Sequence, residues 1–176
     1  MSNVSITKKG DFDLDKSEKA YSRFKKRIPK IMANNSVNHF KKSFTNQGGQ
    51  TNESKGGWKS REFPEGGNTL VQRGTLQKDL QTIRATFNST LVGTSNTTSE
   101  YAEIQNEGGV ITVTDKMRKF FWAKYYDTKK EFWKGMALHK GSTVTIPKRN
   151  YIGDSDSLDV KNLVSLRKEL DKVFNV

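Results

Sequence analysis

The two histidines, His39 and His139, are the side chains best suited to acid–base chemistry near neutral pH. His39 lies between Asn38 and Phe40 in a basic stretch, and neither histidine has a plausible serine or carboxylate partner close by in the sequence. Metal sites usually need several such ligands. We therefore expect both histidines to be ordinary surface or boundary residues, with no metal bound.

The other candidate motifs have simpler explanations than catalysis. The glycine pairs lack the strand-to-helix setting and the Lys-Ser/Thr ending of a phosphate-binding loop. The carboxylates of Asp154 and Asp156 are explained more simply as helix caps than as an acid/base pair. The absence of cysteine excludes disulfides, thiolate metal sites and cysteine nucleophiles. The sequence therefore predicts a protein that is not an enzyme and uses no cofactor.

The composition predicts a lean core and no membrane segment. The 176 residues suit one domain, but only 32% of them are hydrophobic. The mean hydropathy is −0.80. No apolar run approaches the ~20 residues that a membrane span needs, and the N-terminus lacks a signal-peptide core. We expect a soluble protein made in a cytoplasm-like compartment, with no membrane partner.

The formal net charge of +12 is unevenly distributed along the chain. Residues 1–61 and 115–150 are strongly basic, whereas 62–114 and 151–176 carry a small acidic excess. Two basic regions therefore flank a mildly acidic centre. This asymmetry favours contact with nucleic acid or with an acidic protein surface, and a solvated helix face is the simpler alternative.

Hydrophobic periodicity predicts an α+β fold, in which a small, mostly antiparallel sheet packs with N-terminal and C-terminal helices. Long loops and a helical insertion complete it. The expected parts of the single domain 1–176 are a flexible N-terminus (1–14), a helical region (15–44), a long loop (45–68), a sheet (69–115 and 142–153), an aromatic and basic helical insertion (116–141) and a C-terminal helix (155–174).

Local signals predict several element boundaries. Pro29 interrupts the first helical pattern, so either this helix kinks or a second helix begins there. Thr75 and Asp115 are expected to cap short helices. The glycine-rich loop contains Trp58, which we expect to pin the loop to the core.

Two apolar patterns predict which faces are buried. Residues 82–88 and 90–94 read as strands joined by a turn at 88–89, and the first alternates apolar with polar residues as a half-buried strand does. The last helix shows apolar residues at spacings of three and four. The expected inward side chains are Ile83, Ala85 and Phe87 in the strand and Leu163, Leu166, Leu170 and Val173 in the helix.

Seven aromatic residues interleaved with lysines and an arginine lie close together in the helical insertion. Such a pattern is typical of the core of a helical hairpin, of a subunit interface, or of a surface that binds single-stranded nucleic acid. We favour core packing, with an interface next and nucleic acid last. The interface candidates are Phe121, Trp122, Tyr125, Tyr126 and Trp133.

Five short motifs follow one another in order along the chain. They are Trp58 in its glycine-rich loop, Leu70-Val-x-x-Gly74-x-Leu76, Val92-Gly93-Thr94, Tyr101-Ala102-x-Ile104-Gln105-x-x-Gly108, and Ile146-Pro147-x-Arg149-x-Tyr151-Ile152-Gly153. Together they resemble the phage virion-morphogenesis family, the Mu G-like proteins related to tail-completion and tail-terminator proteins. Arg73 stands where that family usually has Thr, and Ile104 where it usually has His.

This resemblance implies a structural protein at the head–tail junction of a virion, assembled in the cytoplasm of the bacterial host. Relatives form rings, commonly sixfold, that cap the tail tube or join it to head-closure or connector proteins. The implied partners are further copies of the chain, expected as a hexamer, together with those proteins. Basic residues would then face packaged DNA in the channel or acidic patches on neighbours.

The resemblance also assigns structural roles to the motif residues. Tyr101 and Ala102 are expected to pack inward, while Gln105 and the pair Gly108-Gly109 shape a turn. We expect residues 45–68 and 101–109 to make contacts within the assembly and to order there. The remaining motif positions are Trp58, Leu70, Gly74, Leu76, Gly93, Thr94, Pro147, Arg149 and Gly153. The alternative is a small basic nucleic-acid-binding module that works alone.

Overall fold

The computed structural model describes residues 14–59, 68–71, 74–95 and 99–174. The predicted flexible N-terminus lies outside this part of the chain, except for Leu14. Helices and antiparallel strands both occur, which confirms the α+β class. In chain order the elements are α1 (Leu14–Asn46), η1 (Asn52–Ser54), α2 (Thr75–Asp79), β1 (Gln81–Ala85), β2 (Thr90–Gly93), α3 (Ser99–Glu107), β3 (Gly109–Thr112), α4 (Asp115–Thr128), α5 (Glu131–Leu138), β4 (Thr143–Ile146) and α6 (Asp156–Phe174).

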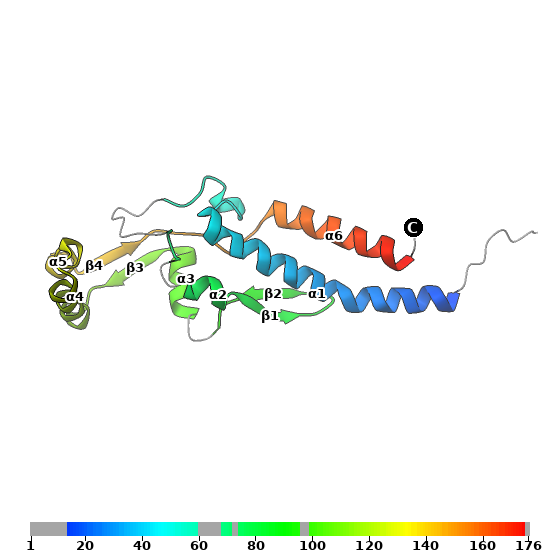
Figure 1. Ribbon diagram of the computed structural model, residues 1–176, viewed down its shortest axis with the longest axis horizontal. Helices are drawn as coiled ribbons and strands as arrows, with labels where there is room; N and C mark the ends of the chain where they lie inside the picture. The colour runs from blue at the N-terminus through cyan, green and yellow to red at the C-terminus, as the bar shows by residue number, and fades with distance from the viewer. Residues whose placement is uncertain (1–13, 60–67, 72–73, 96–98, 175–176) are drawn as a thin grey trace, which may run out of the picture.

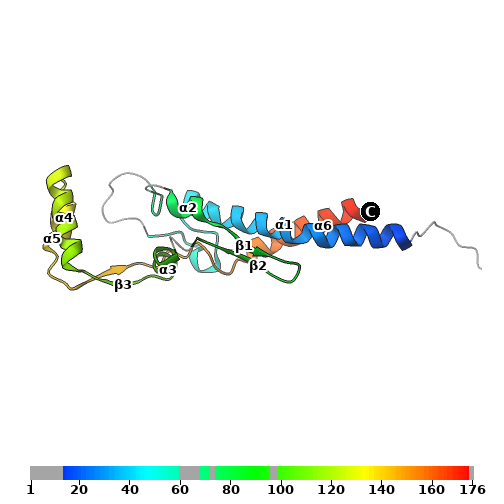
Figure 2. The same ribbon diagram turned by 90° about the horizontal axis from the view of Figure 1, so that it is seen from below.

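The elements form an elongated molecule built along α1 (Figures 1 and 2). Helix α6 runs antiparallel to α1 on one side, and the β1–β2 hairpin lies on another side of α1 (Figure 1). The β3–β4 ribbon leads away from the centre to α4 and α5, which lie at the opposite end from the start of α1. We call residues 115–138 the α4–α5 arm.

The described strands form two separate sheets instead of the single sheet that the sequence predicted. Strands β1 and β2 pair antiparallel, with an irregularity between Thr82 and Arg84, and the connecting turn is closed by a hydrogen bond from Thr86 N to Ser89 O. Strands β3 and β4, which precede and follow the arm in the sequence, pair antiparallel, with Gly109 opposite Ile146. The predicted strands and their antiparallel pairing are correct, but each pair closes on itself.

Helix α1 passes through Pro29 without ending, so the alternative of a second helix starting there is wrong. Proline cannot donate a hydrogen bond within the helix and costs roughly 3 kcal/mol in a helix interior. Tertiary contacts with α6 lie on both sides of it: Arg27 pairs with Glu169, and Asn35 Nδ2 donates to Asn162 Oδ1. These contacts, together with the buried Ile28, hold the two halves of the helix in one element.

Two hydrophobic cores stabilise the molecule. The central core combines the end of α1, α2, α3, the start of α6 and the segment before it; its buried members are Phe40, Phe44, Leu76, Leu80, Ala102, Tyr151 and Leu158. The second core belongs to the arm and its ribbon, with Val113, Phe121 and Ala137 buried. The small number of buried apolar residues agrees with the lean core predicted from composition.

The helix starts differ in detail from the predicted caps. Gly74, at φ +65°, is the N-cap of α2, and Thr75 is the first helical residue. The hydroxyl of Thr114 caps α4 by accepting from Met117 N at 3.3 Å, so Asp115 is in the first turn, where its charge suits the helix dipole. The helix junction predicted near 127–128 is confirmed: α4 ends at Thr128, and Lys129 closes it in the left-handed conformation at φ +56°.

Candidate functional site

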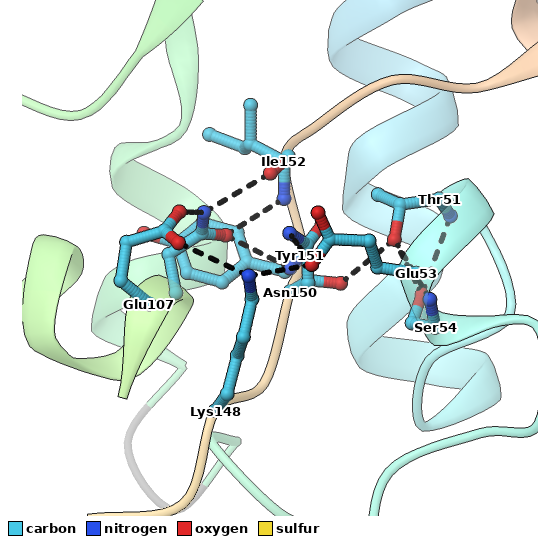
Figure 3. Close-up of polar contacts among 9 residues, drawn as sticks. Thr51, Glu53, Ser54, Glu107, Lys148, Asn150, Tyr151 and Ile152 are labelled. Carbon is cyan, nitrogen blue, oxygen red and sulfur yellow. Dashed lines mark hydrogen bonds and ion pairs between the residues drawn. The ribbon is translucent and has the colours of Figure 1, made fainter. Parts of the chain in front are cut away.

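Three motif regions meet at the centre of the molecule. The segment 147–155 passes between α3 and the turn around η1 (Figure 3). We call this segment, α3 and residues 47–58 the central junction. Tyr151 is its most buried side chain: its ring lies 5.2 Å from that of Phe44, and its hydroxyl donates to Ala102 O at 3.2 Å. Asn106 Oδ1 accepts from the backbone N–H groups of Tyr151 and Ile152, each at 3.0 Å.

The Tyr101–Gly109 and Ile146–Gly153 motifs contact each other directly. Arg149 donates twice to Gln105, from its backbone N to the Gln105 backbone oxygen at 2.9 Å and from Nη1 to Oε1 at 3.0 Å. Gly108 has φ +75°, and a Cβ there would lie 2.8 Å from Lys148 N. Gly108 therefore allows the end of α3 to contact residues 147–149, which follow β4, as the predicted turn requires.

The other motif residues of the junction are packing residues. Leu76 and Ala102 are buried in the central core, and Trp58 and Leu70 pack against it. Trp58 approaches Phe44 edge-on at 5.9 Å, which confirms that it pins the loop to the core. A Cβ at Gly153 would lie 2.7 Å from Asn150 Oδ1, so a larger residue there would displace that amide.

The long loop predicted for 45–68 is partly folded. Helix α1 extends to Asn46, and Thr51 to Ser54 form a capped 3₁₀ turn with both side chains buried. Thr51 Oγ1 also donates to Asn150 O at 3.3 Å, which ties the turn to the junction. The part of this loop at 60–67 lies outside the described residues. Segment 47–58 thus already has internal bonds, which the expectation of ordering on assembly did not anticipate.

An ion-pair group links the three parts of the junction, which are the η1 turn, the end of α3 and the segment 147–155. Lys148 Nζ lies 2.5 Å from Glu53 Oε2 and 3.2 Å from Glu107 Oε2 (Figure 3). The pKa of Lys148 is raised by the bonds to Glu53 and then to Glu107. The pKa of Glu107 is lowered, first by the amide of Asn106 and then by Lys148. All three side chains are substantially solvent-exposed, so the group sets the junction's geometry more than its stability.

His39 is buried, which corrects the prediction that it is a surface or boundary residue. Its Nε2 lies 2.7 Å from Gln50 O and 2.9 Å from Ser155 Oγ. A carbonyl oxygen only accepts, so Nε2 carries the proton. Ser155 Oγ in turn accepts from Leu158 N and caps α6. His39 therefore fixes the loop and the start of α6 against α1, a structural role. His139 is exposed, as predicted.

Several motif residues lie away from the junction's interior. Tyr101 is 53% exposed, so the prediction that it packs inward is wrong, while its neighbour Ala102 is buried. Because residues 101 and 102 are about 100° apart on a helix, only one of them can face the core. Pro147 is exposed at the end of β4, as a strand-ending proline allows. Gly93 and Thr94 lie at the end of β2, half-buried.

The interface candidates of the arm fall into two groups. Phe121 is buried and lies flat against Trp133, with ring centres 6.1 Å apart, so these two side chains form the arm's own core. This contradicts Phe121 as an interface residue. Trp122 is half-buried and packs against this core, and Tyr126 stacks on Trp122 at 6.0 Å and is 65% exposed. Tyr125 lies against both rings. Tyr126 and the open side of Tyr125 are therefore the part of this group available as a surface.

Helix α6 buries its polar side and exposes an apolar one. Toward α1 it presents Asn162, Ser165 and Glu169, which bond to Asn35 and Arg27. Of the apolar residues predicted to face inward, Leu163 is 67% exposed and Leu170 is also exposed. The polar partners on α1 therefore determine which face of α6 is buried. We call the exposed side chains Val160, Leu163, Val164 and Leu170 the outer α6 stripe.

The β1–β2 hairpin also exposes apolar side chains. Every residue of β1 is exposed, so the predicted half-buried strand is wrong for the isolated chain. Ile83, Phe87 and Leu91 are among the exposed large hydrophobic residues. A two-stranded ribbon beside a single helix has too little cover to bury them. Like the outer α6 stripe, the hairpin is an apolar surface without cover in the single chain.

The chemistry of the site is that of positioning and contact. Among the described residues, no group of three or more carboxylate or imidazole side chains is placed to hold a metal ion. No helix in the described ranges combines the length and apolar character needed to cross a bilayer. Comparison of the chain with protein-family models, curated proteins and solved structures gave no significant match.

Sequence patterns did not identify Asn106, Lys148 or Glu53 as residues of the junction. Lys148 and Asn106 occupy unspecified positions of the motifs, yet they make the bonds that join α3 to the 147–152 segment. The one available signal was the Thr51-x-x-Ser54 spacing, which is typical of a capped turn and places Glu53 inside it.

Proposed function

We propose that this chain is a structural subunit of a ring at the head–tail junction of a phage virion. It acts as a tail-completion or tail-terminator protein, or as a neck protein, that caps the tail tube or joins it to the capsid connector. Its location is the virion, and its assembly takes place in the cytoplasm of the bacterial host. The observation that carries the proposal is the pair of uncovered apolar surfaces, the outer α6 stripe and the hairpin.

These surfaces suit a subunit interface because regular elements carry them. Apolar side chains in a repeated row on a well-formed helix can be covered by a partner at small entropic cost. Burial of apolar surface contributes roughly 25 cal/mol per Å², so covering four branched side chains stabilises a contact by several kcal/mol before binding costs. Scattered exposed residues would not need this explanation, but a row does.

The elongated shape supports a head-to-tail contact between neighbours. A ring requires two different patches on each subunit that fit each other and close after a fixed rotation. The chain exposes apolar side chains on α6 and on the β1–β2 hairpin, and Tyr126 on the arm; the arm lies at the opposite end of the molecule from the start of α1 (Figures 1 and 2). The central junction lies between them, and its ion pairs and hydrogen bonds fix the ribbon that carries the arm. The junction is also where the motifs that resemble the phage family meet.

Assembly of the full-length chain tests the proposal. Mass photometry and electron microscopy, with and without purified tail tubes, are expected to reveal closed rings or rings on tube ends. The double variant L163E/L170E places two charges in the outer α6 stripe and should prevent ring formation while circular dichroism retains the helix content. The matched control K168Q/K172Q changes the net charge by the same amount on the same helix outside the stripe and should still assemble.

Two results would contradict the proposal. One is a monomer at all concentrations that never joins tail tubes. The other is assembly that L163E/L170E leaves intact, or that L163E/L170E and K168Q/K172Q disrupt equally; equal disruption would assign the contact to net charge. A monomer that binds nucleic acid tightly would instead support the small nucleic-acid-binding module.

A further inference from the structure

The first half of α1 carries a row of cations on one face. With 100° between successive residues, six basic side chains in the segment 16–30 fall within an arc of about 100°. All six lie in exposed positions. At 1.5 Å per residue the row is roughly 21 Å long. We call it the α1 cationic row: Lys16, Lys19, Arg23, Lys26, Arg27 and Lys30.

The fold leaves this face open because its neighbours lie elsewhere around α1. Arg27 marks the edge nearest α6, where it pairs with the buried Glu169 at 2.6 Å. Lys25 points to a different side, where its Nζ lies over the Phe87 ring of the hairpin at 5.2 Å. The row between these two edges is covered neither by α6 nor by the hairpin.

Within the described part of α1, few carboxylates lie along the row. The acidic residues of α1 are Asp15 and Glu18; helical spacing places Asp15 at the start of the row, one turn before Lys19, and Glu18 on another face. About one turn separates Lys16, Lys19, Arg23, Lys26 and Lys30 in sequence, so the row is a line of positive charge and not a compact cluster.

We propose that the α1 cationic row binds the phosphate backbone of nucleic acid without sequence preference. Protein interfaces depend on apolar and aromatic anchors at their centre, and the row's arc from residue 16 to 30 contains no apolar side chain. A line of phosphates needs only cations at regular intervals and the release of its counterions. An acidic protein surface is the alternative partner, and the absence of an anchor speaks against it.

This inference goes beyond the proposed ring, because the row shares no residue with the outer α6 stripe or the arm. Four phosphate contacts, made by Lys19, Arg23, Lys26 and Lys30, give a salt slope of about −3.6 for duplex DNA. Raising the salt from 50 to 200 mM would then weaken binding roughly 150-fold.

Fluorescence anisotropy with the full-length chain tests the assignment. The probes are a labelled 30-base-pair duplex of mixed sequence and a single strand of the same length, each titrated at several salt concentrations. The variant K19Q/R23Q/K26Q should reduce the duplex slope by about 2.7 and weaken binding at 50 mM salt. Glutamine is a good helix former, so circular dichroism should be unchanged. The control K161Q/K168Q/K172Q removes the same charge from α6, on a face outside the outer α6 stripe, and should keep the wild-type slope.

Salt-dependent binding to either probe that is lost in the row variant alone supports the proposal, and the ratio between probes identifies the preferred form. Equal losses in both variants would overturn it, because net charge would then explain the binding. Tighter binding to polyglutamate than to either nucleic acid would also overturn it. Mass photometry of both variants keeps this question separate from assembly, since neither set of substitutions touches the outer α6 stripe.

Discussion

The hydroxyl of Tyr151 donates a hydrogen bond to the backbone oxygen of Ala102, 3.2 Å away, and so joins the segment before α6 to the middle of α3. Tyr151 is 1% exposed. The bond connects two parts of the chain that lie 49 residues apart. It therefore holds α3 against the segment 147–155 inside the central core.

Removal of this hydroxyl should destabilise the chain modestly. Tyr151→Phe retains the ring that packs on Phe44 and loses one buried hydrogen bond, which is typically worth about 1 kcal/mol. Tyr151→Ala should cost about 3–5 kcal/mol, because it also leaves a cavity. Urea unfolding followed by circular dichroism measures both. Equal losses for the two variants would mean that the ring contributes nothing beyond the hydroxyl.

Alkaline pH should destabilise the protein through the same residue. Burial raises the pKa of Tyr151 above its ordinary value of 10.0. Above that pH the unfolded chain loses the phenolic proton while the folded chain keeps it, so the unfolded state binds fewer protons and the free energy of unfolding falls as pH rises. Unfolding at pH 9 and pH 11 should show a smaller loss in Tyr151→Phe than in the wild type. An identical loss would refute the assignment to Tyr151.

Acid should weaken the ion pairs of the junction. The pKa of Glu107 is lowered below its ordinary value of 4.5 by Asn106 and Lys148. Its contribution is therefore present above pH 4.5 and is lost as the pH falls through the folded pKa. The difference in unfolding free energy between the wild type and Lys148→Gln should be small at pH 7 and smaller at pH 3. Lys168→Gln, an exposed lysine of α6, is the control and should show no such pH dependence.

Substitution of two glycines by alanine should change the stability in opposite directions. Gly108→Ala places a Cβ 2.8 Å from Lys148 N at φ +75° and should cost more than about 1 kcal/mol. Gly135→Ala in α5 has open space around it and should stabilise the arm by about 0.5–1 kcal/mol through helix propensity. Thermal unfolding of both variants gives the sign directly. If Gly108→Ala left the stability unchanged, the end of α3 would be free to shift relative to residues 147–149.

The α4–α5 arm should unfold independently of the central core. Phe121→Ala empties the centre of the arm's core and should open α4 and α5, whereas Tyr126→Ala removes an exposed ring and should have a small effect on folding. Hydrogen exchange resolves the location: protection should fall in 115–138 and persist in the second half of α1. Loss of protection in both regions would mean that the two cores unfold together.

The sequence predicted helices and strands well where periodicity was long, and predicted burial poorly where partners decided it. The helices at 15–44 and 155–174 and the helical pair of the arm follow from apolar spacing, capping residues and turn signals. The exposed Leu163 and Ile83 do not, because a hydrophobic face predicts burial only if something is there to cover it. On α6 the residues that face α1 include Asn162 and Glu169, whose partners on α1 are more than a hundred residues away in the sequence.

The central junction was predictable as a set of positions but not as a set of contacts. The motifs identified Gln105, Gly108 and Arg149 as structural residues, and these do meet. Asn106, Lys148 and Glu53, which make the neighbouring bonds of the junction, are ordinary surface types whose roles depend on tertiary distance. Tyr101 and Phe121 were placed on the wrong side for the same reason, since one helical step decides between core and solvent.

Directional bonds join the middle and the end of helix α6 to α1, while Leu158 at its start packs in the central core. Leu side chains could slide past one another with little change in energy, but a one-turn slip would separate Asn162 from Asn35 and Glu169 from Arg27 together. The polar side of α6 thus fixes both the rotation of the helix about its axis and its position along α1. Any molecule that covers the outer α6 stripe consequently meets it at one angle, and the curvature of an assembly built on that contact would be set by a few hydrogen bonds inside each subunit.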